Sequence, residues 1–468
     1  MTRLSSLALV LVVAPCSAAD PSFRSDVAPV LANRCLSCHS GQKAKGGYKA
    51  HTFADLVTPG KSGEPPAVPG KPDDSELLQR LVDPDPARRM PPADAPLSAD
   101  EIAAIRRWIA AGAKFDGPDK AAAIKTYLPA RNHPPAPEKY PVAMPVHALA
   151  FAPGGNEIAV GGVHEVTIWN ASTGKLIRRI PGLPARIQSL AFSPDGTQLL
   201  VGGGTPGEYG EATLLSLADS TKRKGLGVFE DIVLAVAFSA DGKLAVAGGA
   251  DRSTRTFKID DGRELWRSSF HSDWITAAAF TPDGRFVATA SRDRTVKVLD
   301  AATGKLFTTY NGHRRQYGSH TGQFEVYGVG FDAVGVGYSA GGGDAVRVWE
   351  PVKAQEENGS ASDMEERFSK AGHTRYLEYS AIRPVYALTV VGGQVFTAAG
   401  DGKVRQHDPG PSKLVREFTG PAEWLYSIAA NAKVGRVAAG GFDGMVWVWD
   451  TRTGELVTKF LAAPGLKR

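Results

Sequence analysis

Two cysteines and a histidine near the start of the chain have the spacing needed to hold a haem group. Cys35 and Cys38 are three positions apart, and His39 follows directly. On one helical turn, each thiol can bond a vinyl group of haem, and the adjacent imidazole can then ligate the iron. The run therefore predicts one covalent haem c, with Cys35 and Cys38 as the thioether residues and His39 as the proximal ligand.

A C-x-x-C pair also occurs in zinc sites and in redox-active disulfides. Zinc needs four ligands, and the third cysteine of the chain, Cys16, lies in a leader segment, so no partner pair is available. A thioredoxin-like site would need a strand before the motif, whereas a helical pattern precedes Cys35. A dithiol redox site remains the alternative to haem.

Residues 1–19 have the pattern of a secretory signal peptide. A basic start is followed by the mostly apolar stretch 4–13 and by small residues at 17–19. Cleavage after residue 19 would remove Cys16, so we expect an exported, periplasmic protein. A lipid anchor on Cys16 is the alternative, although Pro15 suits it poorly. No later stretch reaches about 18 consecutive apolar residues, so we expect no transmembrane segment.

Length and composition indicate a globular protein of two or more domains. The chain has 468 residues, of which 43% are hydrophobic and 22% are charged, so it can bury a sizeable core. The net charge of +5 is mild, and no basic block is interleaved with aromatic residues, which argues against a nucleic-acid partner. The 52 glycines imply many tight turns and a β-rich architecture.

Helical patterns dominate before about residue 120. Apolar spacing predicts a helix that starts near Asp26, with Pro29 in its first turn and Phe23 packed just outside it. Ser98 and Glu101 form a capping box that predicts a later helix. The apolar face of that helix would consist of Ile102, Ile105, Trp108 and Ile109.

A methionine is the candidate for the second axial position of the iron. Met90 follows a short helical pattern at 74–82 and precedes two prolines, which stiffen the chain and fix the direction of the thioether. Methionine favours reduced iron and raises the potential. An ordinary apolar role is the alternative. We expect Met90 to be the distal ligand, because the remaining methionines beyond the leader lie outside this part: Met144, Met364 and Met445.

About ninety residues, from Phe23 to Gly112, resemble the planctomycete-type cytochrome c domain. The resemblance implies that Cys35 and Cys38 carry the haem, with His39 proximal and Met90 distal. It rests on motifs in the family's order and spacing: Val27 to Leu31, Gly46-Gly47, Val68 to Pro72, Ser75 to Leu78, Met90-Pro91-Pro92, and Glu101 to Ala113.

One segment departs from that family's pattern. Tyr48 to His51 follows the two glycines, where such domains more often have aliphatic and acidic residues. We expect His51 to be a surface histidine rather than a competing iron ligand.

A second pattern repeats after about residue 145. Apolar strand segments recur about every 40 to 60 residues, and each is followed by a turn, such as Ser193 to Gly196, and by further strands. This is the four-strand period of a propeller blade, and seven units are present. Their apolar segments end at Phe151, Phe192, Phe238, Phe280, Phe331, Val390 and Ala430.

These units resemble the WD-repeat family, which implies a seven-bladed β-propeller. The closing dipeptide is Trp449-Asp450, with variants in other units. Glycine-histidine pairs stand at 312–313 and 372–373. Turn aspartates match the family at Asp251, Asp293, Asp344, Asp401 and Asp443. We expect these histidines and aspartates to be structural. Either Glu455 to Leu461 completes the last blade alone, or a strand near Tyr140 to Met144 clasps it.

The expected organisation is multi-domain. After the leader, residues 20–116 form a small all-α c-type cytochrome domain, 117–140 a stiff proline-rich linker, and 141–463 an all-β seven-bladed WD-repeat propeller.

Arginines and tyrosines cluster in two insertions of the propeller, which we expect to connect successive blades on one face. Such side chains suit a partner-binding rim, although plain solvated loops are an equal alternative. The candidate rim residues are Arg314, Arg315, Tyr317, Arg375, Tyr376 and Tyr379.

Two hypotheses for function follow. In the first, the protein is an exported electron carrier rather than an enzyme, and its propeller docks a redox partner protein. In the second, it is a periplasmic oxidoreductase whose propeller holds its own active site or a second cofactor. No propeller unit contains an acid pair or a Ser-His-Asp arrangement that stands out, so we assign no catalytic residue and favour the first.

Overall fold

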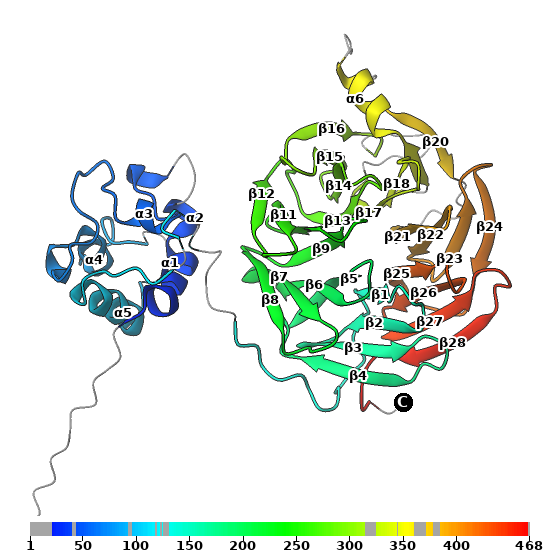
Figure 1. Cartoon of the computed structure of the whole chain (residues 1–468), viewed down its shortest axis with the longest axis horizontal. Helices are drawn as coiled ribbons and strands as arrows, with labels where there is room; N and C mark the ends of the chain where they lie inside the picture. The colour runs from blue at the N-terminus through cyan, green and yellow to red at the C-terminus, as the bar shows by residue number, and fades with distance from the viewer. Residues whose placement is uncertain are drawn as a thin grey trace, which may run out of the picture. The chain divides into compact units, whose positions relative to one another are not determined.

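The chain forms two compact units, residues 1–130 and 131–468 (Figure 1). The computed structural model describes residues 21–39, 44–91, 96–117, 119–121, 124, 131–313, 324–343, 345–359, 371–377 and 384–466. The predicted leader, including Cys16, lies outside these residues. Within them, every helix is too short or too polar to cross a membrane.

Short helices joined by long loops build the first unit. The five α-helices of its described part are brief, so the all-α prediction holds only in part. The helical elements are η1 (Phe23–Val27), α1 (Ala28–Arg34), α2 (Leu36–His39), η2 (Lys45–Gly47), α3 (Phe53–Leu56), η3 (Pro72–Asp74), α4 (Glu76–Val82) and α5 (Ala99–Ala110).

The first helical segment starts earlier than predicted. The Ser22 hydroxyl accepts a hydrogen bond from the Ser25 N–H at 2.9 Å, and the Ala28 N–H donates to the Phe23 carbonyl five residues back. This capped π turn places Phe23 inside the helical segment, so the predicted start near Asp26 is wrong. Pro29 does lie in the first turn of α1, where its missing N–H costs nothing.

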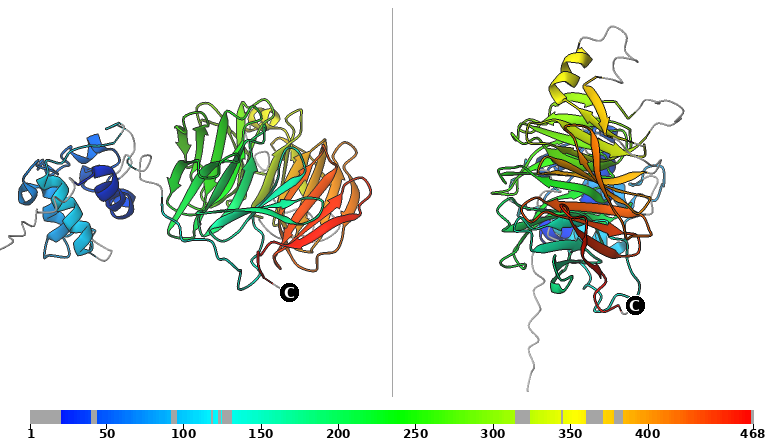
Figure 2. Two further views of the ribbon diagram at one scale, coloured as in Figure 1. Left: turned by 60° about the horizontal axis from the view of Figure 1, so that its bottom comes forward. Right: turned by 90° about the vertical axis from the view of Figure 1, so that its right-hand side faces the viewer.

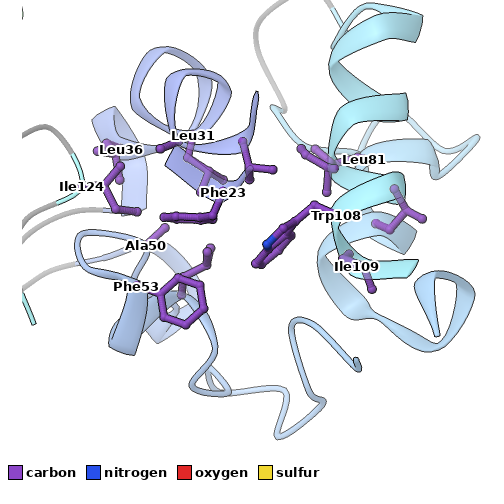
Figure 3. Close-up of a cluster of buried hydrophobic side chains, with 14 of the residues drawn as sticks. Phe23, Leu31, Leu36, Ala50, Phe53, Leu81, Trp108, Ile109 and Ile124 are labelled. Carbon is purple, nitrogen blue, oxygen red and sulfur yellow. The ribbon is translucent and has the colours of Figure 1, made fainter. Parts of the chain in front are cut away.

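The core of the first unit centres on Trp108 of α5 (Figure 3). The predicted capping box is present, since Ser98 and Glu101 each accept a hydrogen bond from the other's backbone N–H. Trp108 is fully buried, and its indole N–H donates to the Lys114 carbonyl at 2.8 Å. Its ring lies 5.4 Å from Phe23, centroid to centroid. α5 therefore anchors the segment that leads into the two cysteines.

Removing the Trp108 side chain should destabilise the unit strongly. We expect Trp108→Ala to lower the free energy of unfolding by about 3–5 kcal/mol, because a large buried ring and its hydrogen bond are lost together. Denaturant unfolding measures this loss. Arg107→Ala, on the exposed side of the same helix, should change stability by less than about 0.5 kcal/mol. Equal effects of the two variants would contradict the packing described.

The second unit is a seven-bladed β-propeller, as predicted, and each blade is one antiparallel four-stranded sheet in chain order (Figures 1 and 2). Blade 1 comprises β1 (Leu149–Phe151), β2 (Glu157–Gly161), β3 (Glu165–Asn170) and β4 (Leu176–Pro181). Blade 2 comprises β5 (Arg186–Phe192), β6 (Gln198–Thr205), β7 (Tyr209–Ser216) and β8 (Arg223–Phe229). Blade 3 comprises β9 (Val233–Phe238), β10 (Leu244–Gly249), β11 (Thr254–Lys258) and β12 (Glu264–Ser268).

The remaining blades follow the same order. Blade 4 comprises β13 (Ile275–Phe280), β14 (Phe286–Ser291), β15 (Val296–Asp300) and β16 (Leu306–Tyr310). Blade 5 comprises β17 (Val326–Phe331), β18 (Gly337–Gly341), β19 (Val346–Trp349) and β20 (His373–Leu377), with helix α6 (Pro351–Gly359) between its last two strands. Blade 6 comprises β21 (Val385–Val391), β22 (Gln394–Ala399), β23 (Val404–Asp408) and β24 (Lys413–Phe418). Blade 7 comprises β25 (Leu425–Asn431), β26 (Arg436–Gly441), β27 (Met445–Asp450) and β28 (Leu456–Leu461).

The ring closes by packing between its first and last blades. β28 completes blade 7 without help, and Tyr140 to Met144 forms no strand. Apolar side chains of blades 1 and 7 share one buried cluster, in which Trp169 stacks on Phe460 at 4.5 Å. The Val146 N–H also donates to the Gly441 carbonyl at 3.1 Å. The first alternative for closure is therefore confirmed, with the segment before β1 tied to blade 7.

Buried polar contacts hold the turns of the blades. His271 Nδ1 lies 2.8 Å from a carboxylate oxygen of Asp293, and His313 Nε2 lies 2.8 Å from the Ser339 hydroxyl. The Trp349 indole N–H donates to that same hydroxyl at 3.2 Å. Each of these side chains makes at least one hydrogen bond inside the sheet, as expected for residues with a structural role, although Nδ1 of His313 makes none.

The described end of the predicted linker is fixed to the propeller. Arg179 donates from Nε to a carboxylate oxygen of the buried Glu165 at 2.7 Å and from a terminal nitrogen to the Pro137 carbonyl at 2.5 Å. The Tyr140 hydroxyl donates to Glu165 at 2.8 Å. Earlier in the segment, His133 Nε2 lies 2.8 Å from a carboxylate oxygen of Glu211 in blade 2. Residues 131–140 therefore follow the surface of blades 1 and 2 instead of standing free.

Candidate haem site

One cavity in the first unit brings together Cys35, His39 and Met90. It encloses about 430 Å³, within the size range of small-molecule sites. Side chains from α1, α4 and the loops around η2 form its wall. Most of the lining is apolar, with Leu31, Tyr48, Leu56, Pro66, Leu77 and Leu81 among the contributing residues.

The imidazole of His39 is oriented by the backbone of the next loop. His39 Nδ1 lies 3.1 Å from the Tyr48 carbonyl oxygen, and the Ala50 N–H donates to the His39 carbonyl at 2.8 Å. A carbonyl oxygen only accepts hydrogen bonds, so Nδ1 carries the proton, and its N–H donates a hydrogen bond to the Tyr48 carbonyl. This leaves the lone pair of Nε2 for a metal, which is the usual arrangement of a ligating histidine.

Tyr48 is a site residue that sequence reasoning missed. Its ring packs against His39 at 5.4 Å between centroids, and its hydroxyl donates to the Leu56 carbonyl at 2.9 Å. The sequence marked Tyr48 only as a departure from the family, because a contact made through a main-chain carbonyl leaves no residue signal. His51, in the same segment, is half-buried and does not line the cavity.

Met90 reaches the cavity from the loop after α4. Its N–H donates to the Arg80 carbonyl at 2.9 Å, which ties this loop to the helix. A turn closed on the Asp85 carbonyl precedes it. Met90 is half-buried and packs against the core, which agrees with an ordinary apolar role. An apolar role alone does not account for its position in the cavity wall. Pro92 lies outside the described residues.

The two cysteines differ in their surroundings. Cys35 caps the end of α1 and lines the cavity, whereas Cys38 lies within α2 and does not line it. Neither forms a disulfide. Burial raises the pKa of the Cys35 thiol to about 12, with the nearby Arg34 charge acting in the opposite direction. Redox-active dithiols need a lowered thiol pKa, so this environment gives the dithiol alternative no support.

These residues fit a haem group. The cavity is apolar and large enough to enclose much of a macrocycle, the imidazole presents its free nitrogen, and a thioether stands in the same wall. Two cations, Lys45 and Lys61, also line the cavity and would meet the carboxylates that haem carries. Arg80 lines it too, but its guanidinium is paired with Glu76, another lining residue, at 3.2 Å.

Two substitutions at Tyr48 separate its hydroxyl from its ring. We expect Tyr48→Phe to lower the free energy of unfolding by about 0.5–1.5 kcal/mol, because the hydrogen bond to Leu56 is lost, and to leave the haem spectrum unchanged. Tyr48→Ala also removes the ring beside His39, so we expect its visible spectrum and midpoint potential to shift. Denaturant unfolding and redox titration measure these effects. Identical spectra for the two variants would remove Tyr48 from the site.

The predicted partner-binding rim is only partly placed. Arg314, Arg315, Tyr317 and Tyr379 lie outside the described residues. Arg375 and Tyr376 lie in β20, so their predicted position in a connection between blades is wrong. Arg375 donates to the Pro409 carbonyl at 2.7 Å, and the Tyr376 ring lies 4.4 Å from that of His373. The helix α6 inserted before β20 displaced this strand from the regular spacing of the sequence.

Comparison with known families agrees with both units. Residues 35–94 match the planctomycete cytochrome C family model. The "WD domain, G-beta repeat" model matches residues 224–258, 262–300 and 412–450. A curated protein, the "THO complex subunit 6" of Arabidopsis thaliana, is 32% identical over 65 residues, which are 14% of this chain and 18% of that protein. The chain thus matches less than a fifth of that relative's length.

Each repeat in the sequence straddles two blades. The match at 224–258 covers β8, the outer strand of blade 2, and β9 to β11 of blade 3, and the match at 412–450 is offset in the same way. Each sequence repeat therefore supplies the outer strand of one blade and the first three strands of the next, which links neighbouring blades covalently. The chain thus joins a planctomycete-type cytochrome c domain at residues 35–94 to a seven-bladed WD-repeat β-propeller.

Proposed function

We propose that this protein is an exported c-type cytochrome that transfers electrons, with one haem c bound covalently by Cys35 and Cys38. The observation that carries the proposal is the apolar cavity that Cys35, His39 and Met90 line together. Haem supplies one-electron chemistry when it is bound there. With His39 and Met90 on its two axial positions, the iron would have no open site for a substrate, which favours a carrier over an enzyme.

The chain's own residues would tune such a centre. The Tyr48 carbonyl holds the His39 ring in one tautomer, the apolar wall keeps water away, and Met90 favours the reduced state. Lys45 and Lys61 would offset the negative charge of the haem carboxylates.

The propeller would dock a redox partner protein. Propellers of this repeat family typically mediate protein–protein contacts, and a ring of interlocked blades presents its loops on a rigid support. The anchored residues 131–140 would fix where the linker leaves that support. The signal-peptide pattern of residues 1–19 supports export to the periplasm.

Cofactor analysis of the full chain tests the proposal. The protein is produced with its own leader in a host that attaches c-type haem, and haem and metals are measured per chain after purification. One haem, a leader-free N-terminus and reversible one-electron titration are expected. A second prosthetic group would favour the oxidoreductase alternative, and a chain without haem would overturn the proposal.

A further inference from the structure

The blades surround a central channel, part of which forms a cavity whose wall is built in layers. Each innermost strand contributes three consecutive residues to a space of about 200 Å³. The innermost strands run in the same direction around the ring, so the first residue of each triplet stands at the same mouth. Those seven residues are His147, Gln188, Leu234, Thr276, Tyr327, Tyr386 and Tyr426.

A β-bulge recurs at this position. In blades 5, 6 and 7 the register skips Tyr327, Tyr386 and Tyr426, so each tyrosine is left out of the ladder. The same skip occurs in blades 2, 3 and 4. A bulge redirects the side chain of its extra residue, and here the extra residues line the mouth of the channel.

Aromatic rings form a continuous arc along one side of this mouth. The ring of Tyr426 lies 4.9 Å from His147 and 5.3 Å from Tyr386, and Tyr386 lies 5.8 Å from Tyr327, all between centroids. Trp424 lies 6.0 Å from Tyr386. We call His147, Tyr327, Tyr386, Trp424, Tyr426 and Phe442 the aromatic arc.

The outer members of the arc are open to solvent. Trp424 is 51% exposed and Phe442 is 52% exposed, and the Phe442 N–H donates to the Trp424 carbonyl at 2.8 Å, which joins their two loops. Phe442 lies 6.3 Å from Tyr426. An exposed tryptophan beside half-buried tyrosine rings on a rigid support is typical of interface hot spots.

Three acidic side chains, Asp273, Glu325 and Glu423, and two arginines, Arg186 and Arg292, lie beside the arc, so the charge there is slightly negative and favours a cationic ligand. Burial raises the pKa of Tyr327, and the nearby Glu325 charge adds to the shift. Burial likewise raises the pKa of Tyr426, with Tyr386 and Glu423 adding to it. The phenols therefore stay neutral, and their π faces attract cations. On the margin, the guanidinium of Arg292 already stacks over Trp274 at 4.5 Å.

We propose that the aromatic arc docks a segment of a partner protein that presents lysine or arginine side chains. Glu325 and Glu423 supply the opposite charge at two points of the arc, and the rings supply contact area. This inference deepens the docking role proposed above and rests on it. The β2–β3 and β6–β7 turns lie on the same face as the arc, and Arg131 stacks on Tyr209 beside the second turn at 4.1 Å. Residues 131–140 and the arc therefore share one face of the propeller.

Binding of short charged peptides to the full chain tests the proposal. The probes are fluorescein-labelled hexa-arginine and hexaglutamate peptides, followed by fluorescence anisotropy at low and high salt. We expect hexa-arginine to bind, hexaglutamate not to bind, and added salt to weaken the binding. Trp424→Ala and Glu423→Lys should each raise the dissociation constant about tenfold or more, a change of about 1.4 kcal/mol.

Two matched variants serve as controls. Glu455→Lys makes the same charge change at an exposed site in the β27–β28 turn, on the opposite face, and Phe270→Ala removes an aromatic ring that is 47% exposed outside the arc. Both should bind the peptide like the wild type. Equal weakening by Glu423→Lys and Glu455→Lys, no hexa-arginine binding, or a dimer that Trp424→Ala dissociates would each overturn the proposal. Haem content is independent of this assay, so the two proposals fail separately.

Discussion

The double variant Cys35→Ala, Cys38→Ala is expected to carry no haem on the denatured polypeptide. Thioether bonds survive denaturation, whereas axial ligation by His39 and Met90 does not. Cys35 lines the cavity, and Cys38 follows it on the next helical turn. They are the two cysteines of the described residues, so no other thiol there can replace them. Haem staining of a denaturing gel, together with the intact mass, measures the loss.

Single variants and a leader variant complete that experiment. Cys35→Ala and Cys38→Ala alone should each retain at most one thioether bond, which shifts the reduced haem spectrum measured in alkaline pyridine. Cys16→Ala should leave haem content unchanged, because export would remove this residue. Covalent haem in the double variant would overturn the assignment. Loss of membrane association in Cys16→Ala would instead support the lipid-anchored alternative.

Signals that act within a few residues predicted structure well. The capping box of Ser98 and Glu101 locates α5, because both hydrogen bonds close within one turn. The propeller could be predicted because every blade repeats the same order of strands and turns, so a weak signal appears seven times. The start of the first helix was misplaced because the hydroxyl of Ser22 caps a π turn, which apolar spacing does not reveal.

Features that depend on contacts between distant segments could not be predicted from the sequence. The orientation of His39 depends on the Tyr48 carbonyl, which any residue type would supply. The aromatic arc collects residues from blades 5, 6 and 7 and from the segment before β1, and the bulges that turn its tyrosines inward appear only in the strand register. Arg375 was misplaced for a related reason, since the insertion of α6 hides the strand that contains it.

Replacing Met90 by alanine should lower the midpoint potential and change the spectrum of the low-spin iron. The thioether is a soft, neutral ligand that stabilises reduced iron, so its loss favours the oxidised form. We expect a decrease on the order of 0.1 V, a fraction of the roughly 0.8 V that axial ligands span. Spectroelectrochemical titration of the purified full chain measures the potential and the spectrum together.

The control is Met144→Ala, which removes a partly exposed methionine from the second unit. It should change neither potential nor spectrum. Met90 packs against the core of the first unit, so circular dichroism must show that Met90→Ala remains folded before its spectrum is interpreted. A folded Met90→Ala protein with unchanged potential and spectrum would make Met90 an ordinary apolar residue. The iron would then have a position open to other ligands, and the main physical argument for a carrier over an enzyme would be lost.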